Sequence, residues 1–424
     1  MNTLRISTAI VSAIAISPAA MGTNECDKWK TFGEGLDSIV VAVHVHQGEL
    51  IAIGGFNAFD AVARWNGESW EQLGEGLNTS GTRATMVTFE GDLVAVGPLA
   101  LQDSSHVGMV LWDGNTWQAI GEQACSGAVQ TVGVVGGELY LGLSNNTECE
   151  HHVDGFENPI GGLLHWNGEY WSQVGETELG AVRAIVEYEG DLVISDTINP
   201  SIPGFIRRWT GDSWEILGES LGGPVDALVV HEGDLIVGGD FQSIDGLPLQ
   251  RIARYDGQQW LAMTLGMDNF VRDLHVHDGE LYAGGRFETV AENPANRLVR
   301  WNNLTWVEFE GGVGTGNNQI YAMTSYQGNL VVAGSFTEVG DGITMNRIAQ
   351  FDACPEPATG ACCTGSGCLP LTAEMCASIG GAYLGDDVAC AEGACATCPG
   401  DLNLDGVVDV LDLLELLDAW GTCP

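Results

Sequence analysis

The segment VDALVVHEGDLIVGGDFQSIDGLPLQRIARYDGQQW, from Val225 to Trp260, decides how this chain of 424 residues folds. β-Branched and aromatic residues gather in short runs that Gly and Asp separate, a composition typical of strands and tight turns. Asp256-Gly257 suits a hairpin turn in which both central residues take positive φ. We expect four strands, over Val225–His231, Leu235–Gly239, Arg251–Tyr255 and onward from Gln259.

The same pattern recurs along most of the chain. Its marker is an apolar run that ends in Gly, an acid and Leu, with Asn329 in place of the acid in the last copy. The seven marker glycines are Gly48, Gly91, Gly137, Gly190, Gly233, Gly279 and Gly328, at spacings of 43, 46, 53, 43, 46 and 49 residues. Repeats of this length with four strand-like runs have the size of one propeller blade. We therefore expect an all-β ring or stack.

The two ends of the repeat array favour a ring. The last copy stops at Phe351-Asp352 without its final strand, while Trp29–Leu36 (WKTFGEGL) matches Trp70–Leu77 (WEQLGEGL). A closed ring needs its first strand to complete the last blade and leave no open sheet edge. We predict a seven-bladed β-propeller over residues 23–354, closed by its N-terminal strand. Aligning the ends also brings Cys26 next to Cys354, and we predict a disulfide between them.

Six of the seven repeats carry two aromatic residues five positions apart, as in WNGESW at Trp65 and WTGDSW at Trp209. We interpret these pairs as packing between adjacent blades rather than as a surface for stacking a ligand.

The motif GxLxxGGxF followed by IARWxGxxW resembles kelch-like bacterial propeller repeats, and the resemblance covers Trp29 to Asp352. It implies the propeller fold and no particular function. Close backbone packing near the central channel would explain the glycines. The second, third and fourth copies depart from the motif, so we expect any specialised surface there; they read Gly97-Pro98, Gly142-Leu143 and Ser195-Asp196.

Composition points to export. Residues 1–22 have a charged start, an apolar run and small residues, as in a secretory signal peptide, and no other run is long enough to span a bilayer. The twelve cysteines suit an oxidising compartment. A net charge of -42 with two lysines excludes a general nucleic-acid or anionic-membrane binder. The acidity favours solubility over an acidic binding face. We expect a secreted protein associated with the cell surface.

Residues 355–397 form a second region, a linker followed by a disulfide module. Six cysteines lie between Cys362 and Cys395 among too few apolar residues for a core, which predicts three bridges. Their pairing stays open, although adjacent Cys362 and Cys363 should take different partners. We also expect a bridge between Cys125 and Cys149 across the longest insertion. For Cys395 and Cys398, whose spacing suits zinc, we favour disulfides.

Residues 398–424, CPGDLNLDGVVDVLDLLELLDAWGTCP, contain a calcium-loop pattern. Oxygen-bearing side chains alternate, Gly406 permits the sharp turn and the Val407 carbonyl adds a ligand, as a hard cation needs. The predicted calcium ligands are Asp401, Asn403, Asp405, Val407, Asp409 and Asp412. The alternative is a solvated acidic helix start. We also expect a bridge between Cys398 and Cys423 that clips the ends of this segment together.

This tail resembles the dockerin-like modules of bacterial surface proteins that end in Trp-Gly-x-Cys, here Trp420 to Cys423. The resemblance implies attachment to a surface-anchoring or cohesin-like partner. Dockerins that bind cohesins commonly carry two loop-helix copies, and this chain has one, which leaves cohesin binding open.

Two functions remain in view. The first is a binding or scaffold propeller with a protein or glycan on its face and a calcium-dependent tail; the second is a secreted propeller enzyme that acts on glycans or peptides. We favour the first and assign no catalytic residue. Three or more convergent carboxylates, histidines or arginines in a deep pocket would favour catalysis. The repeat register places His44, His46, His231, His275 and His277 in strands, and we interpret the polar insertion Cys149–Asp154 as structural.

Overall fold

The computed structural model describes residues 28–75, 77–79, 83–101, 108–120, 129–144, 162–175, 179–197, 204–314, 316–340, 342–353, 359–364, 367–385 and 388–390. These residues fall into two compact units, one within Glu25–Asp352 and the other within Ala353–Pro424.

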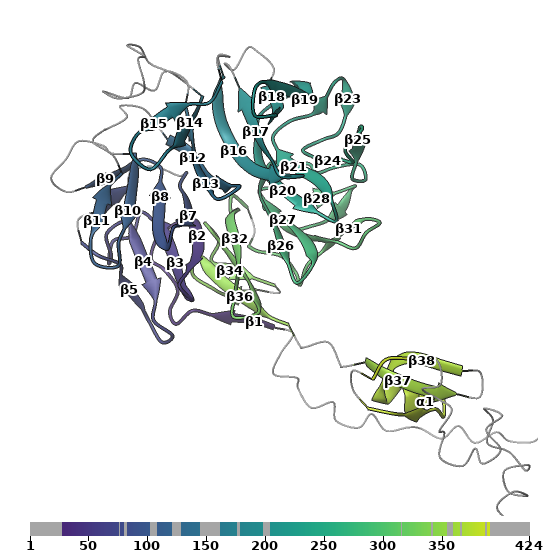
Figure 1. Cartoon of the computed structure of the whole chain (residues 1–424). Helices are drawn as coiled ribbons and strands as arrows, with labels where there is room; N and C mark the ends of the chain where they lie inside the picture. The colour runs from purple at the N-terminus through teal and green to yellow at the C-terminus, as the bar shows by residue number, and fades with distance from the viewer. Residues whose placement is uncertain are drawn as a thin grey trace, which may run out of the picture. The chain divides into compact units, whose positions relative to one another are not determined.

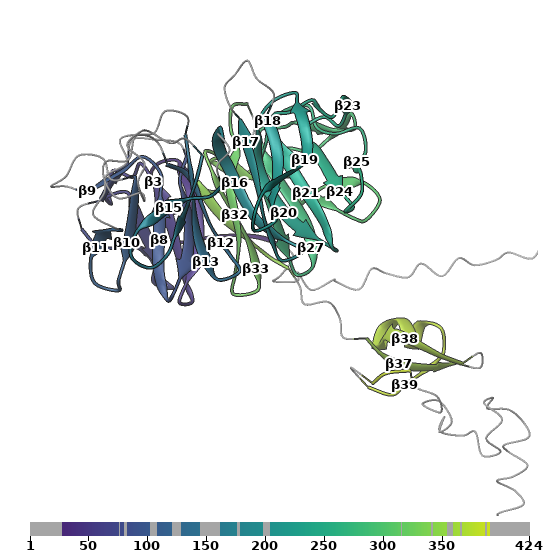
Figure 2. The same cartoon turned by 45° about the horizontal axis from the view of Figure 1, so that its top comes forward.

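The described residues of the larger unit form seven four-stranded antiparallel sheets arranged around a central axis (Figures 1 and 2). The first strands lie nearest the axis: β2 (Val40–His46), β7 (Thr85–Phe89), β12 (Val129–Val135), β16 (Ala181–Tyr188), β20 (Val225–His231), β26 (Val271–His277) and β32 (Ile320–Tyr326). The second strands are β3 (Glu49–Gly54), β8 (Asp92–Val96), β13 (Glu138–Leu143), β17 (Asp191–Thr197), β21 (Asp234–Gly239), β27 (Glu280–Gly285) and β33 (Asn329–Gly334). Each first strand contacts the first strands of both neighbouring sheets, and β32 contacts β2, so these strands form a closed ring.

The outer strands complete each sheet. The third strands are β4 (Val62–Trp65), β10 (Met109–Trp112), β14 (Leu163–Trp166), β18 (Gly204–Trp209), β24 (Ile252–Tyr255), β30 (Leu298–Trp301) and β36 (Ile348–Asp352). The fourth strands are β5 (Trp70–Gln72), β11 (Trp117–Ala119), β15 (Trp171–Gln173), β19 (Trp214–Leu221), β25 (Trp260–Ala262), β31 (Trp306–Glu308) and β1 (Lys28–Thr31). Four two-stranded ribbons follow second or fourth strands: β6 (Leu77–Thr79) with β9 (Leu99–Leu101), β22 (Ser243–Ile244) with β23 (Leu247–Pro248), β28 (Thr289–Val290) with β29 (Asn293–Pro294), and β34 (Glu338–Val339) with β35 (Ile343–Thr344).

The N-terminal strand closes the ring as predicted. β1 pairs with β36, and Trp29 lies opposite Phe351 in the register. The indole of Trp29 also donates a hydrogen bond of 3.0 Å to the carbonyl oxygen of Glu310, from the neighbouring sheet. The last sheet therefore has no open edge on its β36 side.

The Gly-acid-Leu marker forms the turn between the first and second strands. In the first sheet Gln47 (φ 50°) and Gly48 (φ 84°) connect the paired residues His46 and Glu49. Two positive φ angles define the type I′ turn that matches the twist of a hairpin. Glycine supplies the second of these angles without steric cost.

In the fourth, fifth and sixth sheets the acid of the marker pairs with an arginine on the third strand of its own sheet. Asp191 lies 2.6 Å from Arg208, Asp234 3.0 Å from Arg254, and Glu280 2.8 Å from Arg300. The equivalent positions in the last sheet are Asn329 and Gln350, so both members lose their charge together. Such exposed pairs contribute at most about 1 kcal/mol each.

The outer Asp-Gly turn differs from our prediction. Asp256 does not take positive φ; the turn is a four-residue loop between the paired residues Tyr255 and Trp260. The Asp256 carboxylate accepts hydrogen bonds of 2.9 Å from the backbone amides of Gln258 and Gln259. With its side chain capping the loop amides, Asp256 keeps negative φ, and the next residue, Gly257 (φ 87°), takes the left-handed conformation.

The aromatic pairs pack between sheets, which confirms that prediction. Trp112 and Trp117 face each other across their strands with ring centroids 5.4 Å apart. The Trp117 indole donates a hydrogen bond of 2.7 Å to the carbonyl of Leu73 in the preceding sheet. A Cβ atom on Gly74 would lie 2.4 Å from the Trp112 ring, so only glycine fits against this pair.

Close backbone approach explains the glycine that ends the second strand, as expected. A Cβ on Gly239 would lie 2.2 Å from the carbonyl oxygen of Pro224, and one on Gly285 2.1 Å from that of Phe270. Both contacts are shorter than any side chain tolerates without a backbone shift.

The smaller unit is a cystine-stapled fold of β37 (Thr359–Thr364), β38 (Gly367–Thr372), β39 (Ala382–Tyr383) and the short helix α1 (Ala373–Ser378). Disulfides join Cys362 to Cys376 and Cys368 to Cys390. Cys363 is also disulfide-bonded, so the two adjacent cysteines have different partners, as predicted. The buried Cys362, Cys363 and Cys376 replace an apolar core.

Several predictions lie outside the described residues. They are the signal peptide at 1–22, the predicted disulfides Cys26–Cys354, Cys125–Cys149 and Cys398–Cys423, the insertion Cys149–Asp154, and the calcium loop within 398–424.

Candidate functional site

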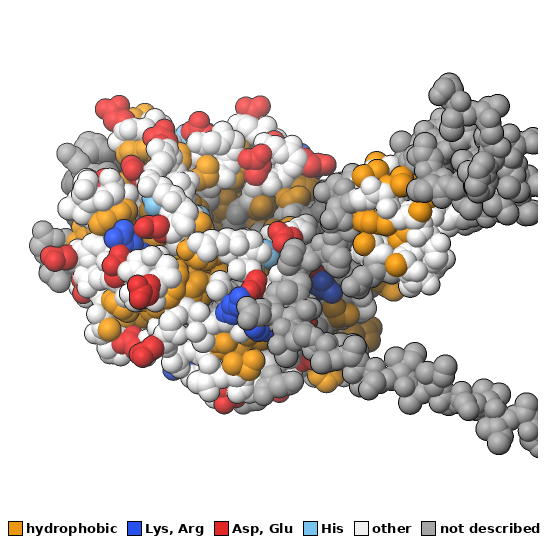
Figure 3. Space-filling view, turned by 90° about the horizontal axis from the view of Figure 1, so that it is seen from below, with side chains coloured by type: hydrophobic (Ala, Val, Ile, Leu, Met, Phe, Trp, Pro, Cys, Tyr) orange, Lys and Arg blue, Asp and Glu red, His pale blue; other side chains and the backbone are white. Residues whose placement is uncertain are grey.

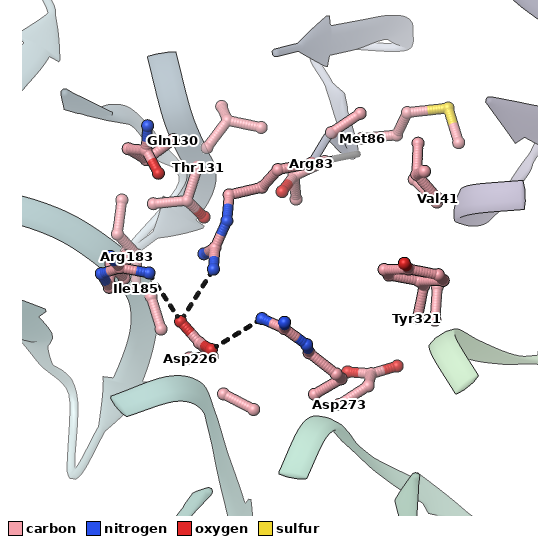
Figure 4. A pocket seen from close by; sticks show the side chains of 18 of the residues that line it. Val41, Arg83, Met86, Gln130, Thr131, Arg183, Ile185, Asp226, Asp273 and Tyr321 are labelled. Atoms are coloured by element: carbon pink, nitrogen blue, oxygen red, sulfur yellow. Dashed lines mark hydrogen bonds and ion pairs between the residues drawn. The ribbon is translucent and has the colours of Figure 1, made fainter. Parts of the chain in front are cut away.

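A cavity of about 270 Å³ opens where the first strands of the ring begin (Figure 4). Every first strand contributes residues to its wall, so the cavity is the mouth of the central channel. We refer to it below as the channel mouth.

β-Bulges place the polar residues of the channel mouth. In six of the seven sheets the pairing of the first and second strands skips one residue near the start of the first strand. A bulge leaves its extra residue outside the ladder and re-aims its side chain. The skipped residues all line the cavity; they are Val41, Gln130, Arg183, Asp226, Arg272 and Tyr321.

The second sheet reaches the same cavity differently. The pairing of β7 with β8 has no such shift. Arg83, which lies two residues before β7, supplies the side chain that lines the cavity from this sheet.

Three arginines converge on one carboxylate in the channel mouth (Figure 4). Arg83 Nη2 and Arg183 Nη1 lie 2.9 and 3.0 Å from Asp226 Oδ1, and Arg272 Nη1 lies 3.1 Å from Asp226 Oδ2. The side chain of Asp226 is 5% exposed, whereas the arginine side chains are 27–30% exposed. We call these four residues the arginine cluster.

The arginine cluster has more donors than Asp226 can accept. Each guanidinium has five N–H donors, and a carboxylate offers about four acceptor positions. The buried Nε–H groups of Arg183 and Arg272 have no hydrogen-bond partner among the described residues. The cluster therefore keeps unsatisfied donors and a positive charge that one carboxylate does not balance.

Two carboxyl groups in the channel mouth have opposite pKa shifts. Burial disfavours the charge of Asp226, but the positive charges of Arg83 and Arg183, with Arg272, outweigh it and lower the pKa of Asp226. Burial raises the pKa of Asp273 to about 7, although its carboxylate accepts hydrogen bonds from the backbone amides of Met323 and Leu274. At neutral pH Asp226 is ionised and Asp273 is partly protonated.

An apolar layer lies behind the arginine cluster. Apolar residues further along the first strands also line the cavity; they are Val43, Met86, Val132, Ile185, Leu228 and Met323. The channel mouth thus combines a cationic rim with an apolar floor.

The cationic cluster contrasts with the rest of the molecule. The chain carries 57 acidic and 15 basic residues, so the three arginines of the cluster are a fifth of all its lysines and arginines. Acidic side chains are scattered over the face drawn in Figure 3. That distribution agrees with acidity that serves solubility rather than one acidic binding face.

The five histidines that the repeat register assigned to strands all lie in first strands, as predicted; they are His44, His46, His231, His275 and His277. His44 and His46 both hydrogen-bond to Thr88 Oγ1, at 2.9 and 3.0 Å. Burial lowers the pKa of His44 to about 4, and burial likewise lowers the pKa of His275 to about 4. These rings are neutral at neutral pH and connect neighbouring first strands.

The departure of the fourth repeat from the glycine motif has a structural role. Asp196 takes the place of the second glycine, and its buried carboxylate contacts Arg207 at 2.9 Å and the backbone amide of Gly180 at 2.9 Å. Ser195 donates a hydrogen bond of 3.0 Å to the carbonyl of Val225 in the next sheet. The fourth repeat contributes to the channel mouth instead through Arg183.

The arginine cluster was not predicted from the sequence. The predicted calcium ligands and the three cysteine pairs predicted by name all lie outside the described residues, among which no group of three or more His, Cys, Asp or Glu side chains suits a metal ion. A signal for the channel mouth was nevertheless present. Each bulge residue stands seven positions before the marker glycine of its repeat. At this position the six repeats differ in residue type, with Val, Gln, Arg, Asp, Arg and Tyr in chain order.

Several solved structures resemble this chain. The extracellular domain of a hybrid two component system from B. thetaiotaomicron is 14% identical with a TM-score of 0.51; the match covers 79% of this chain and 41% of that one. This chain therefore spans about two-fifths of that structure. Other similar structures are the WD40 propeller domain of Doa1 (14% identity, TM-score 0.42, 74% and 93% covered) and YCF48 bound to D1 peptide (13%, 0.47, 77% and 97%). At these identities the likeness shows the fold alone.

No family model matches the chain, and no curated protein matches it either. Among the described residues, no helix combines the length and apolar character needed to cross a membrane. The disulfides of the smaller unit are typical of an oxidising compartment, which agrees with an extracellular location.

Proposed function

We propose that this protein is an exported, seven-bladed binding propeller whose ligand site is the channel mouth and whose tail docks it to a surface partner. One blade corresponds to each four-stranded sheet. The observation that carries the proposal is the arginine cluster, which gathers unsatisfied donors at the open end of a cavity with an apolar floor. Concave, mostly apolar sites with a few placed polar groups are typical of ligand binding.

The composition of the cluster favours binding over catalysis. Three convergent arginines in a pocket meet the condition that we set for an enzyme, but a guanidinium stays protonated and exchanges no proton with a substrate. Asp226 is held ionised by its three partners, so it too is a weak base. These groups fix a ligand's charge and orientation without an evident nucleophile.

One observation supports a secreted enzyme as the second candidate. Asp273 lines the same cavity, and its pKa of about 7 suits a general acid or base at neutral pH. In that case Asp273→Asn would abolish turnover of a glycan or peptide while binding persists.

The tail supplies the attachment in our proposal. Asp401, Asn403, Asp405, Asp409 and Asp412 have the spacing of a calcium loop, and the sequence around and after Asp412 contains the apolar residues Leu411, Leu414 and Trp420, which suit contact with a cohesin-like or other anchoring partner. Calcium would order this loop and so control docking.

Arrays of proteins, peptides and glycans, exposed to the intact mature protein with calcium or with a chelator, test both halves. Gln130→Trp fills the channel mouth and should abolish propeller binding, whereas Gln118→Trp on the exposed strand β11 should not. Deleting residues 398–424 should release the protein from the surface of producing cells. A propeller ligand unaffected by Gln130→Trp would refute the channel site, and conversion of a hit to product would favour the enzyme.

A further inference from the structure

We infer that the channel mouth recognises a carboxylate carried on an aliphatic group, as at the C-terminus of a peptide chain that ends in an apolar residue. This inference rests on the proposed binding function and specifies its ligand. It combines the arginine cluster with the apolar layer directly behind it.

The excess positive charge of the arginine cluster indicates a negatively charged ligand. Three guanidinium groups face one ionised carboxylate, and the Nε–H groups of Arg183 and Arg272 lack partners among the described residues. Arginine binds carboxylates through paired, charge-assisted hydrogen bonds. Asp226 already shows how a carboxylate sits between Arg83, Arg183 and Arg272, and it fixes the three side chains before a ligand arrives (Figure 4).

The apolar residues that line the cavity indicate that the carboxylate of the ligand is attached to an aliphatic group. Val43, Met86 and Leu228 are among the apolar side chains that line the cavity beyond the arginines, and a second anionic or strongly hydrated group there would lose water without gaining a partner. An aliphatic side chain gains from burial at the same place. A sugar acid, with hydroxyl groups around its ring, fits this floor poorly.

The size of the cavity favours the end of a chain. A volume of about 270 Å³ lies just below the usual range for small-molecule sites, so it holds one terminal group rather than a length of polymer. A peptide terminus and a free small acid share this chemistry, and the experiment separates them.

Fluorescence anisotropy of N-terminally labelled Gly-Gly-Gly-Leu tests the inference on the intact mature protein. We expect the free acid to bind about tenfold or more tightly than the C-terminal amide, because charged hydrogen bonds of this kind account for at least that ratio. Raising the salt concentration should weaken binding of the peptide acid and leave binding of the peptide amide unchanged. N-acetyl-leucine that competes as well as the unlabelled peptide would identify a small acid as the source; weaker competition would identify a peptide terminus.

Variants assign the effect to the cluster. Arg183→Gln should remove the preference for the acid, Arg183→Lys should keep part of it, and Arg254→Gln, on an outer strand, should change nothing. Leu228→Ser should reduce the preference for a terminal Leu over a terminal Gly. The comparison of peptide acid with peptide amide uses the unmodified protein, so it tests carboxylate recognition even where a variant fails to fold.

Equal binding of acid and amide, or no binding of either at millimolar concentration, would overturn the inference. A ligand without a carboxylate that binds and is blocked by Gln130→Trp would overturn it as well and leave the proposed binding function intact. Loss of every array ligand would instead remove the proposed function itself.

Discussion

Replacing Asp226 with Asn keeps the volume of the side chain and removes the charge that three arginines share. Breaking a buried ion pair by neutralising one partner costs about 3 to 5 kcal/mol, because the other charges stay buried without compensation. The arginine side chains are 27–30% exposed, so water screens part of their repulsion. We expect a loss in unfolding free energy of about 3 kcal/mol, at the lower end of that range.

The same loss can be expressed as a melting temperature. The larger unit runs from Lys28 to Asp352, roughly 325 residues, which implies an unfolding entropy of about 0.7 kcal/mol per kelvin. Asp226→Asn should therefore lower the melting temperature by about 4 °C in calorimetry, and added salt should restore part of the difference. Asp234→Asn is the matched control, because Asp234 pairs with the more exposed Arg254 and should cost no more than about 1 kcal/mol.

The pH dependence gives an independent check. The pKa of Asp226 is lowered in the folded protein, so its contribution is present above the unfolded pKa of about 4 and is lost as the pH falls through the folded pKa. The difference in unfolding free energy between the unmodified protein and Asp226→Asn should therefore be largest at neutral pH and should become smaller in acid. A gap below 1 kcal/mol at neutral pH, or one that does not narrow in acid, would contradict the charge argument.

Four further predictions follow from other parts of the fold. Because the pKa of Asp273 is raised to about 7, its contribution to the unfolding free energy is fully present below pH about 4 and is lost as the pH rises through 7. Asp273→Asn should remove up to about 4 kcal/mol of this pH dependence, measured as unfolding free energy against pH. An unchanged pH profile would refute the prediction. Trp260→Phe breaks the 2.7 Å bond to the Leu217 carbonyl and should cost about 1 kcal/mol more in urea unfolding than Trp214→Phe, whose Nε1–H has no acceptor among the described residues; equal losses would show that the bond contributes nothing. Gly239→Ala forces a Cβ to 2.2 Å from a carbonyl oxygen and should cost about 2 kcal/mol or more, whereas Gly48→Ala meets open space and should cost about 1 kcal/mol through its φ of 84°; the reverse order would refute the steric argument. Non-reducing peptide mapping should find Cys26 joined to Cys354, and a free thiol at either position would disprove that disulfide.

The repeat pattern predicted the strands because β-branched and aromatic residues gather in short runs that glycine and aspartate separate. In the fifth repeat, the predicted strand Val225–His231 is β20, and the next two predicted strands match β21 and β24 to within one residue. Closure by β1 was also predictable, since the two ends of the array are complementary pieces of one repeat. These features depend on local sequence and on pairing with a neighbouring strand.

The arginine cluster was not predicted, because its four residues come from four different sheets and are far apart in the sequence. Arg83, Arg183 and Arg272 are separated by 100 and 89 residues, and each by itself is an arginine near the start of a strand. The deciding feature is the bulge, which depends on the pairing register and not on any residue type. Without knowledge of the bulges, residues seven positions before the marker glycine look like ordinary members of the first strand.

Closure by β1 also bears on the order of folding. Trp29 is synthesised 322 residues before its partner Phe351. Contacts this distant in the chain form late, since a large loop must close first. Until β36 is complete, the growing ring exposes a bare strand edge at each end, and unpaired edges promote aggregation. Synthesis of β36 and its pairing with β1 are therefore the steps that end the exposure of these edges.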